Sequence, residues 1–211
     1  MTSTVFCIDF DETLSSTDQL RADIAQAVRR IGGEELGTAY QVAYETVRKQ
    51  HGAVRIPLVL QAIAEQTDID STTIKQLADM FHTIPYQSYL YPGAEELIAR
   101  LKKHSKVIIF SDGDAFFQPQ KIYSTRVADI VDAVIILTDK TKHFADLEGY
   151  YPAERYVFID DKQRVLDAAK SHFGDRCTTV LVQQGRYVDS SQLSTADLSV
   201  STISDATNLF D

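Results

Sequence analysis

The spacing of hydrophobic side chains changes along the chain and divides it into three segments. Residues 5–8 form a short apolar run with β-branched and aromatic side chains, which predicts a buried strand. Between about residues 15 and 90 the apolar positions recur every three or four residues, as on one face of a helix. From about residue 91 onward, short apolar runs alternate with segments of helical period. This order predicts a strand, a helical insertion and then alternating strands and helices.

The insertion is predicted to contain four amphipathic helices. Their apolar faces fall within residues 20–31, 36–47, 56–63 and 74–84. Gly32 and Gly33 are expected to end the first helix, and Asp70 or Ser71 is expected to cap the fourth. An insertion of this length suits a small four-helix unit.

The rest of the chain predicts α/β architecture. Strands are predicted over residues 106–110, 133–137, 156–159, 178–182 and 198–200. Helices are predicted within residues 92–104, 119–129, 141–148 and 162–173, and after Ser201 or Thr202. From Tyr187 the sequence is rich in Ser, Thr and Asp, so a disordered tail is the alternative to the last strand and helix.

Alternating strands and helices with short connections imply a parallel sheet that helices cover on both faces. The predicted fold class is therefore α/β, with a Rossmann-like, doubly wound parallel sheet. Residues 1–14 and 91–211 are predicted to form this core, and residues 15–90 are predicted to form an inserted helical domain.

Charge and cysteine content narrow the function classes. The formal net charge is −9 over 211 residues, without any run of Lys or Arg, which argues against a nucleic-acid or anionic-membrane binder. Cys7 and Cys177 do not make a disulfide framework and fit a reducing compartment. No secretory signal is visible before the first strand, and the apolar runs are too short to span a bilayer. We expect a cytoplasmic protein, a monomer or small homo-oligomer, with no nucleic-acid or membrane partner.

Candidate chemistry begins where the first strand ends, at Asp9-Phe10-Asp11-Glu12-Thr13. Side chains alternate along an extended strand, so Asp9 and Asp11 can project to the same side. Two neighbouring carboxylates at the end of a buried strand repel each other, and a cation between them or protonation of one relieves this repulsion. The pair suggests a Mg²⁺ site and phosphate chemistry.

Polar residues also follow three of the later strands. They are Ser111-Asp112-Gly113-Asp114, Thr138-Asp139-Lys140 and Asp160-Asp161. Right-handed crossovers place the carboxyl ends of parallel strands at one edge of the sheet, and ligands bind outside that edge. We therefore expect these groups to converge with Asp9 and Asp11.

In this order the motifs resemble those of the haloacid dehalogenase-like (HAD) superfamily, whose members are mostly Mg²⁺-dependent phosphatases. The resemblance covers nearly the whole chain: Asp-x-Asp-x-Thr, a strand that ends in Ser, a Lys, and Asp-Asp after another apolar strand. Residues 15–90 look like the family's inserted C1-type cap. The resemblance implies a hydrolase that acts on a small phosphorylated metabolite.

The same resemblance implies roles for the acidic residues. Asp9 would be the nucleophile that forms an aspartyl-phosphate, and Asp11 would be the general acid and base. Asp9, the backbone carbonyl of Asp11 and Asp161 would hold Mg²⁺, while Asp160 would orient a water bound to the metal.

Other residues would hold the phosphate. Ser111 would donate a hydrogen bond to a phosphoryl oxygen, and the backbone N–H groups after Asp9 and Ser111, at Phe10 and Asp112, would complete the cradle. Thr13 is expected to keep the first loop in shape. Asp112 and Asp114 add acid near the phosphate pocket, and their side chains are expected to point away from it.

The lysine that neutralises the phosphoryl group has three candidates. Lys140 follows a strand directly and is favoured, whereas Lys142 lies within the next helix and Lys121 lies beyond the second motif. Lys162, directly after the acid pair, is predicted to be a solvated helix residue.

In the insertion, three cationic or titratable side chains are possible contacts to an anionic substrate tail. They are Arg21, His51 and Arg55, and solvated positions are the simpler expectation for them.

Other functions remain open at this point. A phosphomutase on the same scaffold would return the phosphoryl group to the product instead of to water. A catalytically silent binding or regulatory protein could keep the fold. A dehalogenase is less expected, because that chemistry uses the nucleophilic aspartate but needs neither a second one nor a metal-binding acid pair.

Overall fold

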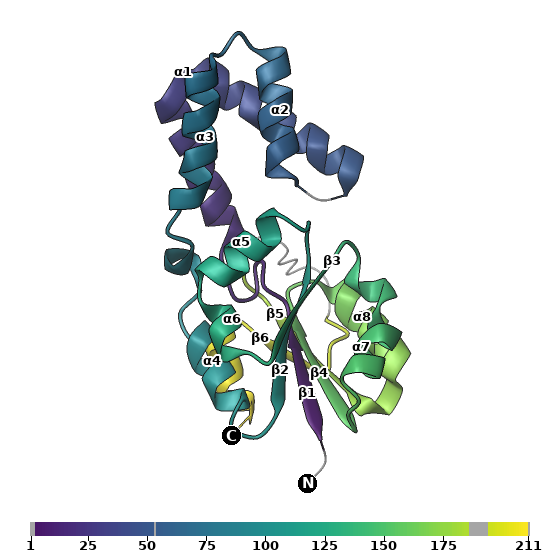
Figure 1. Cartoon of the computed structure of the whole chain (residues 1–211). Coiled ribbons are helices and arrows are strands. Elements are labelled where there is room, and N and C mark those ends of the chain that lie inside the picture. Colours follow the sequence, from purple (N-terminus) through teal and green to yellow (C-terminus); the bar gives the residue numbers. More distant parts are fainter. Residues whose placement is uncertain (1–2, 53, 186–193, 211) are drawn as a thin grey trace.

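Six parallel strands form the central sheet of the protein (Figure 1). The computed structural model describes residues 3–52, 54–185 and 194–210. The strands are β1 (Thr4–Ile8), β2 (Lys106–Asp112), β3 (Ala133–Leu137), β4 (Arg155–Asp160), β5 (Cys177–Val182) and β6 (Leu198–Val200). Their order is β3-β2-β1-β4-β5-β6, and each neighbouring pair is parallel. The predicted α/β class is confirmed.

The order of the strands positions the site. The chain adds β2 and β3 on one side of β1, and then returns to add β4, β5 and β6 on the other side. The two halves diverge between β1 and β4, and the crevice outside the carboxyl ends of the strands at such a switch point is where doubly wound sheets bind ligands. The fold therefore directs attention to the residues that follow β1.

Successive residues of a strand face opposite sides of the sheet and pack under different helices. Phe6 and Ile8 belong to one core together with α4 (Ala94–Leu101), α6 (Val127–Ile130) and α9 (Ile203–Ala206). Val5 and Cys7 belong to the opposite core, under α7 (Phe144–Tyr150) and α8 (Gln163–Phe173). Both faces of β1 are buried, which explains why its sequence is a continuous apolar run.

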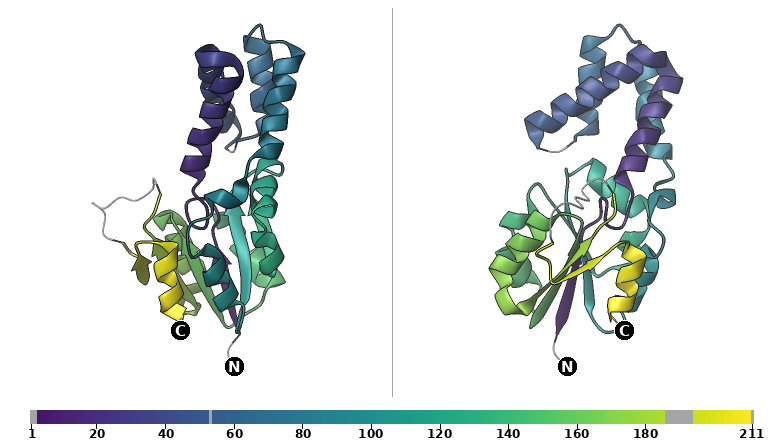
Figure 2. Two further views of the ribbon diagram at one scale, coloured as in Figure 1. Left: turned by 90° about the vertical axis from the view of Figure 1, so that its left-hand side faces the viewer. Right: turned by 180° about the vertical axis from the view of Figure 1, so that it is seen from behind.

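Three helices extend beyond the carboxyl edge of the sheet (Figure 2). They are α1 (Thr17–His51), α2 (Ile56–Gln66) and α3 (Ser71–Thr83), and they surround a buried cluster that includes Leu20, Val28, Val59, Ile63 and Leu77. Phe117 of α5 (Phe117–Ser124) joins that cluster and contacts the ring of Phe81 edge-on at 5.9 Å. The boundaries of a separate cap at residues 15 and 90 stay a prediction.

The prediction that Gly32 and Gly33 end the first regular helix is confirmed, although the helices on either side of them are joined directly and share the label α1. Both residues leave helical geometry, Gly32 at φ −138° and ψ 21° and Gly33 at φ 75° and ψ −172°. The two glycines therefore divide α1 into two helical arms, which together with α2 and α3 correspond to the four helices predicted for the insertion.

Replacing Gly33 with alanine should lower the free energy of unfolding by ~1–3 kcal/mol, because only glycine adopts its backbone angles without strain. A Cβ at this position would meet no atom within 4 Å, so the expected loss is conformational and not steric. Denaturant unfolding measures it. Gly149→Ala is the control, since a Cβ there also meets nothing within 4 Å but the residue is helical. Equal stability of the two variants would contradict the assignment.

Two predicted elements differ at their ends. Strand β2 extends beyond Phe110 to Asp112, because Ser111 and Asp112 pair with Ile136 and Leu137 of β3. The helix predicted over residues 119–129 is divided into α5 and α6, since Arg126 has a φ of 62°. Short 3₁₀ turns complete the structure: η1 (Tyr86–Tyr89), η2 (Lys140–Lys142), η3 (Gly174–Arg176) and η4 (Thr207–Phe210).

The C-terminal strand and helix are confirmed where the chain is described. β6 occupies residues 198–200, and Thr202 caps α9 through reciprocal hydrogen bonds with Asp205. Residues 186–193, part of the alternative disordered tail, lie outside the described residues. Over the described ranges, the helices lack the combination of length and apolar composition that a bilayer crossing requires.

Candidate active site

Four neighbouring strands bring the predicted residues together at the carboxyl edge of the sheet. Asp9 follows β1, Ser111 lies near the end of β2, Lys140 begins η2 after β3, and Asp160 ends β4. Because β1 is flanked by β2 and β4 and β3 lies beyond β2, Asp9 is at the centre of this arrangement. The expected convergence is present.

Lys140 is a fully buried cation that contacts two of the acids. Its Nζ lies 2.7 Å from Asp9 Oδ1 and 2.6 Å from Asp160 Oδ2, and it donates a hydrogen bond to the carbonyl oxygen of Phe110 at 3.1 Å. Burial alone would lower the pKa of Lys140, but Asp160 and Asp9 outweigh burial and raise it. The side chain therefore remains an ammonium, and of the three candidate lysines it is the one bonded to Asp9.

Asp9 is held as a carboxylate. Burial opposes its charge, but Lys140 and then Lys162 outweigh burial and lower the pKa of Asp9 to about 2. Its Oδ1 is paired with Lys140, whereas Oδ2 is buried and accepts no hydrogen bond. An ionised carboxylate with one oxygen fixed and the other unoccupied by a donor is suited to act as a nucleophile or as a metal ligand.

The geometry fits a divalent cation. Carboxylate oxygens of Asp9, Asp160 and Asp161 lie within 4.8 Å of one another, and all three residues are buried. Both oxygens of Asp161 lack a hydrogen-bond donor, and burial, followed by the charge of Asp9, raises the pKa of Asp161 above its usual value. Buried carboxylates that lack donors are costly unless a cation binds them, and hard oxygen ligands are those that Mg²⁺ prefers.

Asp11 is held by side chains from three directions. Thr17 of α1 and Lys121 of α5 both contact its Oδ1 at 2.5 Å, and Gln118 donates to Oδ2 at 3.0 Å. The side chain of Asp11 is 23% exposed, whereas that of Asp9 is 1% exposed, so Asp11 is the more accessible of the two acids. Lys121, a candidate for the phosphate-binding lysine, thus contacts Asp11.

Ser111 and Gln118 form a buried pair beside these acids. Ser111 Oγ accepts a hydrogen bond of 2.9 Å from Gln118 Nε2, the same nitrogen that donates to Asp11. A Cβ at Gly113 would lie 2.4 Å from Cγ of Gln118, so glycine there lets Gln118 approach the strand end. The sequence analysis did not identify Gln118 or Thr17 as site residues. The one local signal for Gln118 is Gly113, because a side chain at that position would clash with it.

Asp112 and Asp114 hold the loops of the site in place. Asp112 Oδ1 accepts a hydrogen bond of 2.6 Å from the backbone N–H of Lys140, and Asp114 accepts the N–H groups of Phe116 and Phe117 at the start of α5. Their carboxylates are thus engaged with backbone donors, but both residues also line the cavity beside Asp11, so the expectation that they point away from the phosphate pocket stays a prediction.

The first loop is shaped mainly by Glu12 and Phe10. Glu12 has a φ of 61°, and its carboxylate accepts hydrogen bonds from the backbone N–H of Asp18 at 2.7 Å and the hydroxyl of Tyr91 at 3.0 Å. The carbonyl oxygen of Phe10 accepts the N–H groups of Leu14 and Ser15. Thr13 is fully buried, its hydroxyl has no hydrogen-bond partner among the described residues, and its expected role in keeping the loop in shape stays a prediction.

The prediction that Lys162 is a solvated helix residue is wrong. Its Nζ lies 3.6 Å from both Asp9 Oδ2 and Asp161 Oδ1, and its side chain is only 19% exposed. Lys162 precedes the first residue of α8 with extended backbone angles, φ −107° and ψ 108°. Its side chain is therefore outside the solvent-facing surface of the helix and reaches the acidic groups.

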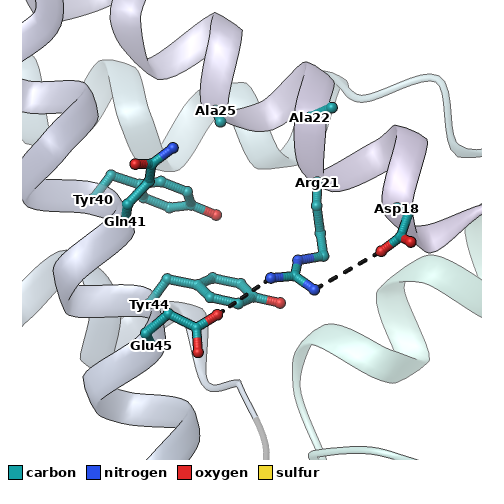
Figure 3. A pocket seen from close by; sticks show the side chains of 8 residues that line it. All are labelled: Asp18, Arg21, Ala22, Ala25, Tyr40, Gln41, Tyr44 and Glu45. Carbon is teal, nitrogen blue, oxygen red and sulfur yellow. Dashed lines mark hydrogen bonds and ion pairs between the residues drawn. The ribbon is translucent and has the colours of Figure 1, made fainter. Parts of the chain in front are cut away.

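Two cavities lie near the site, one between the core and the insertion and one within the insertion. The first, of about 220 Å³, is lined by Asp11, Lys121 and Lys162 from the core and by Arg21, Tyr44 and Arg48 from α1. The second, of about 550 Å³, lies between the two arms of α1 (Figure 3). Arg21 and Tyr44 line both cavities. The cavity beside Asp11 therefore extends toward α1 of the insertion.

Arg21 is already paired with acids of the insertion. Its guanidinium lies 3.3 Å from Glu45 and 3.9 Å from Asp18, and it stands over the ring of Tyr44 at 4.9 Å (Figure 3). His51 and Arg55, the other two candidate contacts to a substrate tail, line neither cavity.

Comparison with known proteins places the chain in a family. A scan against models of protein families finds no match, and neither does a search of curated protein sequences. Among solved structures, the chain is similar to a haloacid dehalogenase-like hydrolase from Burkholderia xenovorans LB400, with 32% identity, coverage of 99% of this chain and 97% of the other, and a TM-score of 0.87.

Two more distant structures share the fold. One is the HAD-hydrolase YfnB from Bacillus subtilis bound to magnesium, with 9% identity, full coverage of both chains and a TM-score of 0.64. The other is an L-2-haloacid dehalogenase from Xanthobacter autotrophicus with chloropropionic acid covalently bound, with 16% identity, 99% and 98% coverage and a TM-score of 0.62. Given the 32% identity over nearly the full length of the first structure, the chain belongs to the haloacid dehalogenase-like hydrolases.

Proposed function

We propose that this hydrolase is a Mg²⁺-dependent phosphatase of small phosphate monoesters that works through an aspartyl-phosphate on Asp9. The observation that carries the proposal is the state of Asp9. It is a buried carboxylate with a pKa of about 2, and Lys140 fixes one of its oxygens, whereas the other accepts no hydrogen bond. Together with Asp160 and Asp161 it forms the acid cluster that could hold a metal ion.

The proposed reaction has two steps, in which Asp9 is the nucleophile and Asp11 transfers the protons. In the first step a carboxylate oxygen of Asp9 forms a bond to phosphorus and the bond to the ester oxygen breaks, while Asp11 gives that oxygen a proton. In the second step water attacks the phosphorus, Asp11 takes the proton of the water, and the bond between Asp9 and phosphorus breaks. Inorganic phosphate leaves, and Asp9 and Asp11 return to their starting states.

The other side chains orient and neutralise the reacting groups. Lys140 keeps Asp9 ionised and aligned, and it compensates negative charge beside the phosphoryl group. Ser111, at the end of β2, has a hydroxyl that can turn from Asp112 toward a phosphoryl oxygen. Gln118 connects Ser111 to Asp11 and so sets the distance between the phosphate site and the acid.

The acid cluster would hold the metal. The proposed direct ligands are Asp9 and Asp161, whose buried oxygens lack donors, and the backbone carbonyl of Asp11. Asp160 is the proposed ligand to a metal-bound water, since Lys140 and the N–H of Lys162 occupy its oxygens. When bound, Mg²⁺ would supply positive charge that polarises the phosphoryl group and reduces its repulsion from Asp9.

Hydrolytic dehalogenation is the second candidate. The pair of Asp9 and Lys140 supplies a nucleophile and a cation, which is enough to displace a halide from carbon. Phosphatase chemistry is favoured because it also uses Asp11, with its three donors, and Asp161, with its two oxygens without donors.

The cavities support a small substrate. The volume beside Asp11 and Lys121 is about 220 Å³, which accommodates a phosphoryl group and a short organic group, and Arg21 and Tyr44 lead from it to the larger cavity. We infer that the leaving group of the ester extends toward these two residues.

Three assays on the wild-type protein test the proposal. We expect phosphate release from a generic aryl phosphate in the presence of Mg²⁺, and loss of that activity in excess EDTA with recovery after Mg²⁺ is restored. Halide release from 2-chloropropionate without phosphatase activity would favour the dehalogenase. Isomerisation of a sugar phosphate without free phosphate would indicate a mutase, and no turnover in any assay would indicate a silent member of the family.

A further inference from the structure

Lys162 occupies a place that the proposed chemistry does not explain. Its ammonium lies 3.6 Å from Asp9 Oδ2 and 3.6 Å from Asp161 Oδ1. These atoms are among the buried carboxylate oxygens that accept no hydrogen bond, and they belong to the two carboxylates proposed as direct metal ligands. A cation supplied by the chain itself therefore stands beside the place where a divalent ion would bind.

The charge of the cluster explains why a cation is stabilising there. Asp9, Asp160 and Asp161 carry three carboxyl groups, and Lys140 and Lys162 supply two ammonium groups within 4 Å of them. Lys140 is committed to Asp9 and Asp160. Of the two lysines, Lys162 is the one paired with Asp161, so without its charge the Asp161 carboxylate would have no cation within ion-pair distance among the described residues.

We propose that Lys162 is a tethered cation that shares the Asp9–Asp161 site with the divalent metal ion. It neutralises the two acids in the metal-free protein, and it opposes metal binding until its side chain moves away. This inference rests on the proposed metal dependence of the site.

The local structure allows that movement. The backbone of Lys162 is fixed, because its N–H donates to Asp160 Oδ1 at 2.9 Å and its carbonyl oxygen accepts the N–H of Val165 at 3.0 Å. The side chain, by contrast, lines the 220 Å³ cavity together with Asp11 and Lys121. A flexible four-carbon stem can therefore swing its ammonium from the acids into the cavity without a change in the backbone.

Removing the charge of Lys162 should strengthen metal binding. Titration calorimetry with Mg²⁺ should give a dissociation constant for Lys162→Met that is lower than that of the wild type by about tenfold or more, because the ion no longer meets a neighbouring positive charge. Lys162→Arg keeps the charge and should bind Mg²⁺ as weakly as the wild type does. Lys142→Met removes a lysine whose side chain is 75% exposed, and it should leave the dissociation constant unchanged.

A second measurement needs no metal. In EDTA, the urea midpoint of Lys162→Met should fall below that of the wild type, since buried Asp161 loses its paired cation and Asp9 keeps only Lys140. The midpoints of Lys162→Arg and Lys142→Met should remain close to wild type. Saturating Mg²⁺ should reduce the deficit of Lys162→Met, because the metal replaces the missing charge.

The outcomes separate this inference from the proposed phosphatase activity. Equal or weaker Mg²⁺ binding by Lys162→Met, or an unchanged midpoint in EDTA, would overturn the shared-site role of Lys162 even if the wild type is a phosphatase. Absence of Mg²⁺ binding by both proteins would also overturn it. Tighter binding by the variant, with no phosphate ester hydrolysed by either protein, would support the shared site and reject the phosphatase.

Discussion

Replacing Asp9 with asparagine should abolish phosphate release, with kcat lower by at least ~10³-fold, because an amide oxygen cannot replace the attacking carboxylate. The expected loss is this large because no other carboxylate among the described residues has the same placement. Asp161 lacks the contact with Lys140, and Asp11 is held by Thr17, Gln118 and Lys121. Initial rates with a generic aryl phosphate at saturating Mg²⁺ measure the effect.

The fold should survive this substitution. Lys140 keeps its ion pair with Asp160 at 2.6 Å, and asparagine has nearly the shape of aspartate. Asp79→Asn, at a position on α3 that is 60% exposed, is the matched control and should keep wild-type activity. Acid-quenched wild type should carry a phosphoryl group in mass spectra, and Asp9→Asn should not. A variant that retains turnover or is still phosphorylated would exclude Asp9 as the nucleophile.

The sheet and its acidic edge could be predicted because their signals are local. A strand buried on both faces must be a continuous apolar run, and the runs from Val107 to Phe110 and from Tyr156 to Ile159 are of this kind. Once the strands are parallel, right-handed crossovers bring the polar residues after them to one edge. These two rules are enough to predict that Asp9, Asp160 and Asp161 lie at the same edge of the sheet.

The partners of those acids could not be predicted in the same way. Residue type does not distinguish the three candidate lysines, Lys121, Lys140 and Lys142, because it is the same at each position. The path of the chain after β3 brings Lys140 into contact with Asp9, whereas Lys142 stays exposed. Lys162 was expected in solvent because charged residues at helix starts are usually solvated. Lys162 instead has extended backbone angles just before the helix, and its side chain reaches Asp9 and Asp161.

The bend of α1 shows a similar limit. Two consecutive glycines correctly predict where the regular helix ends, but they do not determine the direction in which the next helix leaves. The packing decides this, because residues of both arms, among them Leu20 and Tyr40, share one buried cluster. The cavity between the arms, with Arg21 paired to Glu45 across it, is a consequence of that bend.

Replacing Lys140 with methionine should lower both stability and activity. The substitution leaves Asp9 and Asp160 buried without their shared cation, and breaking such a pair costs about 3–5 kcal/mol. The rate should fall by ~10²–10³-fold, because charge at the phosphoryl group loses a positioned neighbour. Urea unfolding in Mg²⁺ and initial rates below the unfolding transition measure the two effects separately.

The other two candidate lysines provide the comparison. Lys121→Met should lower kcat by less, since Asp11 keeps Thr17 and Gln118 as donors and remains partly exposed. Lys142→Met should change the free energy of unfolding by less than ~1 kcal/mol, because its pair with Asp139 is exposed. The order of losses, Lys140 before Lys121 before Lys142, follows from burial and from what each ammonium contacts. A larger loss at Lys121 than at Lys140 would mean that the phosphoryl group is neutralised from α5 and not from η2, and the assignment of Lys140 would then be wrong.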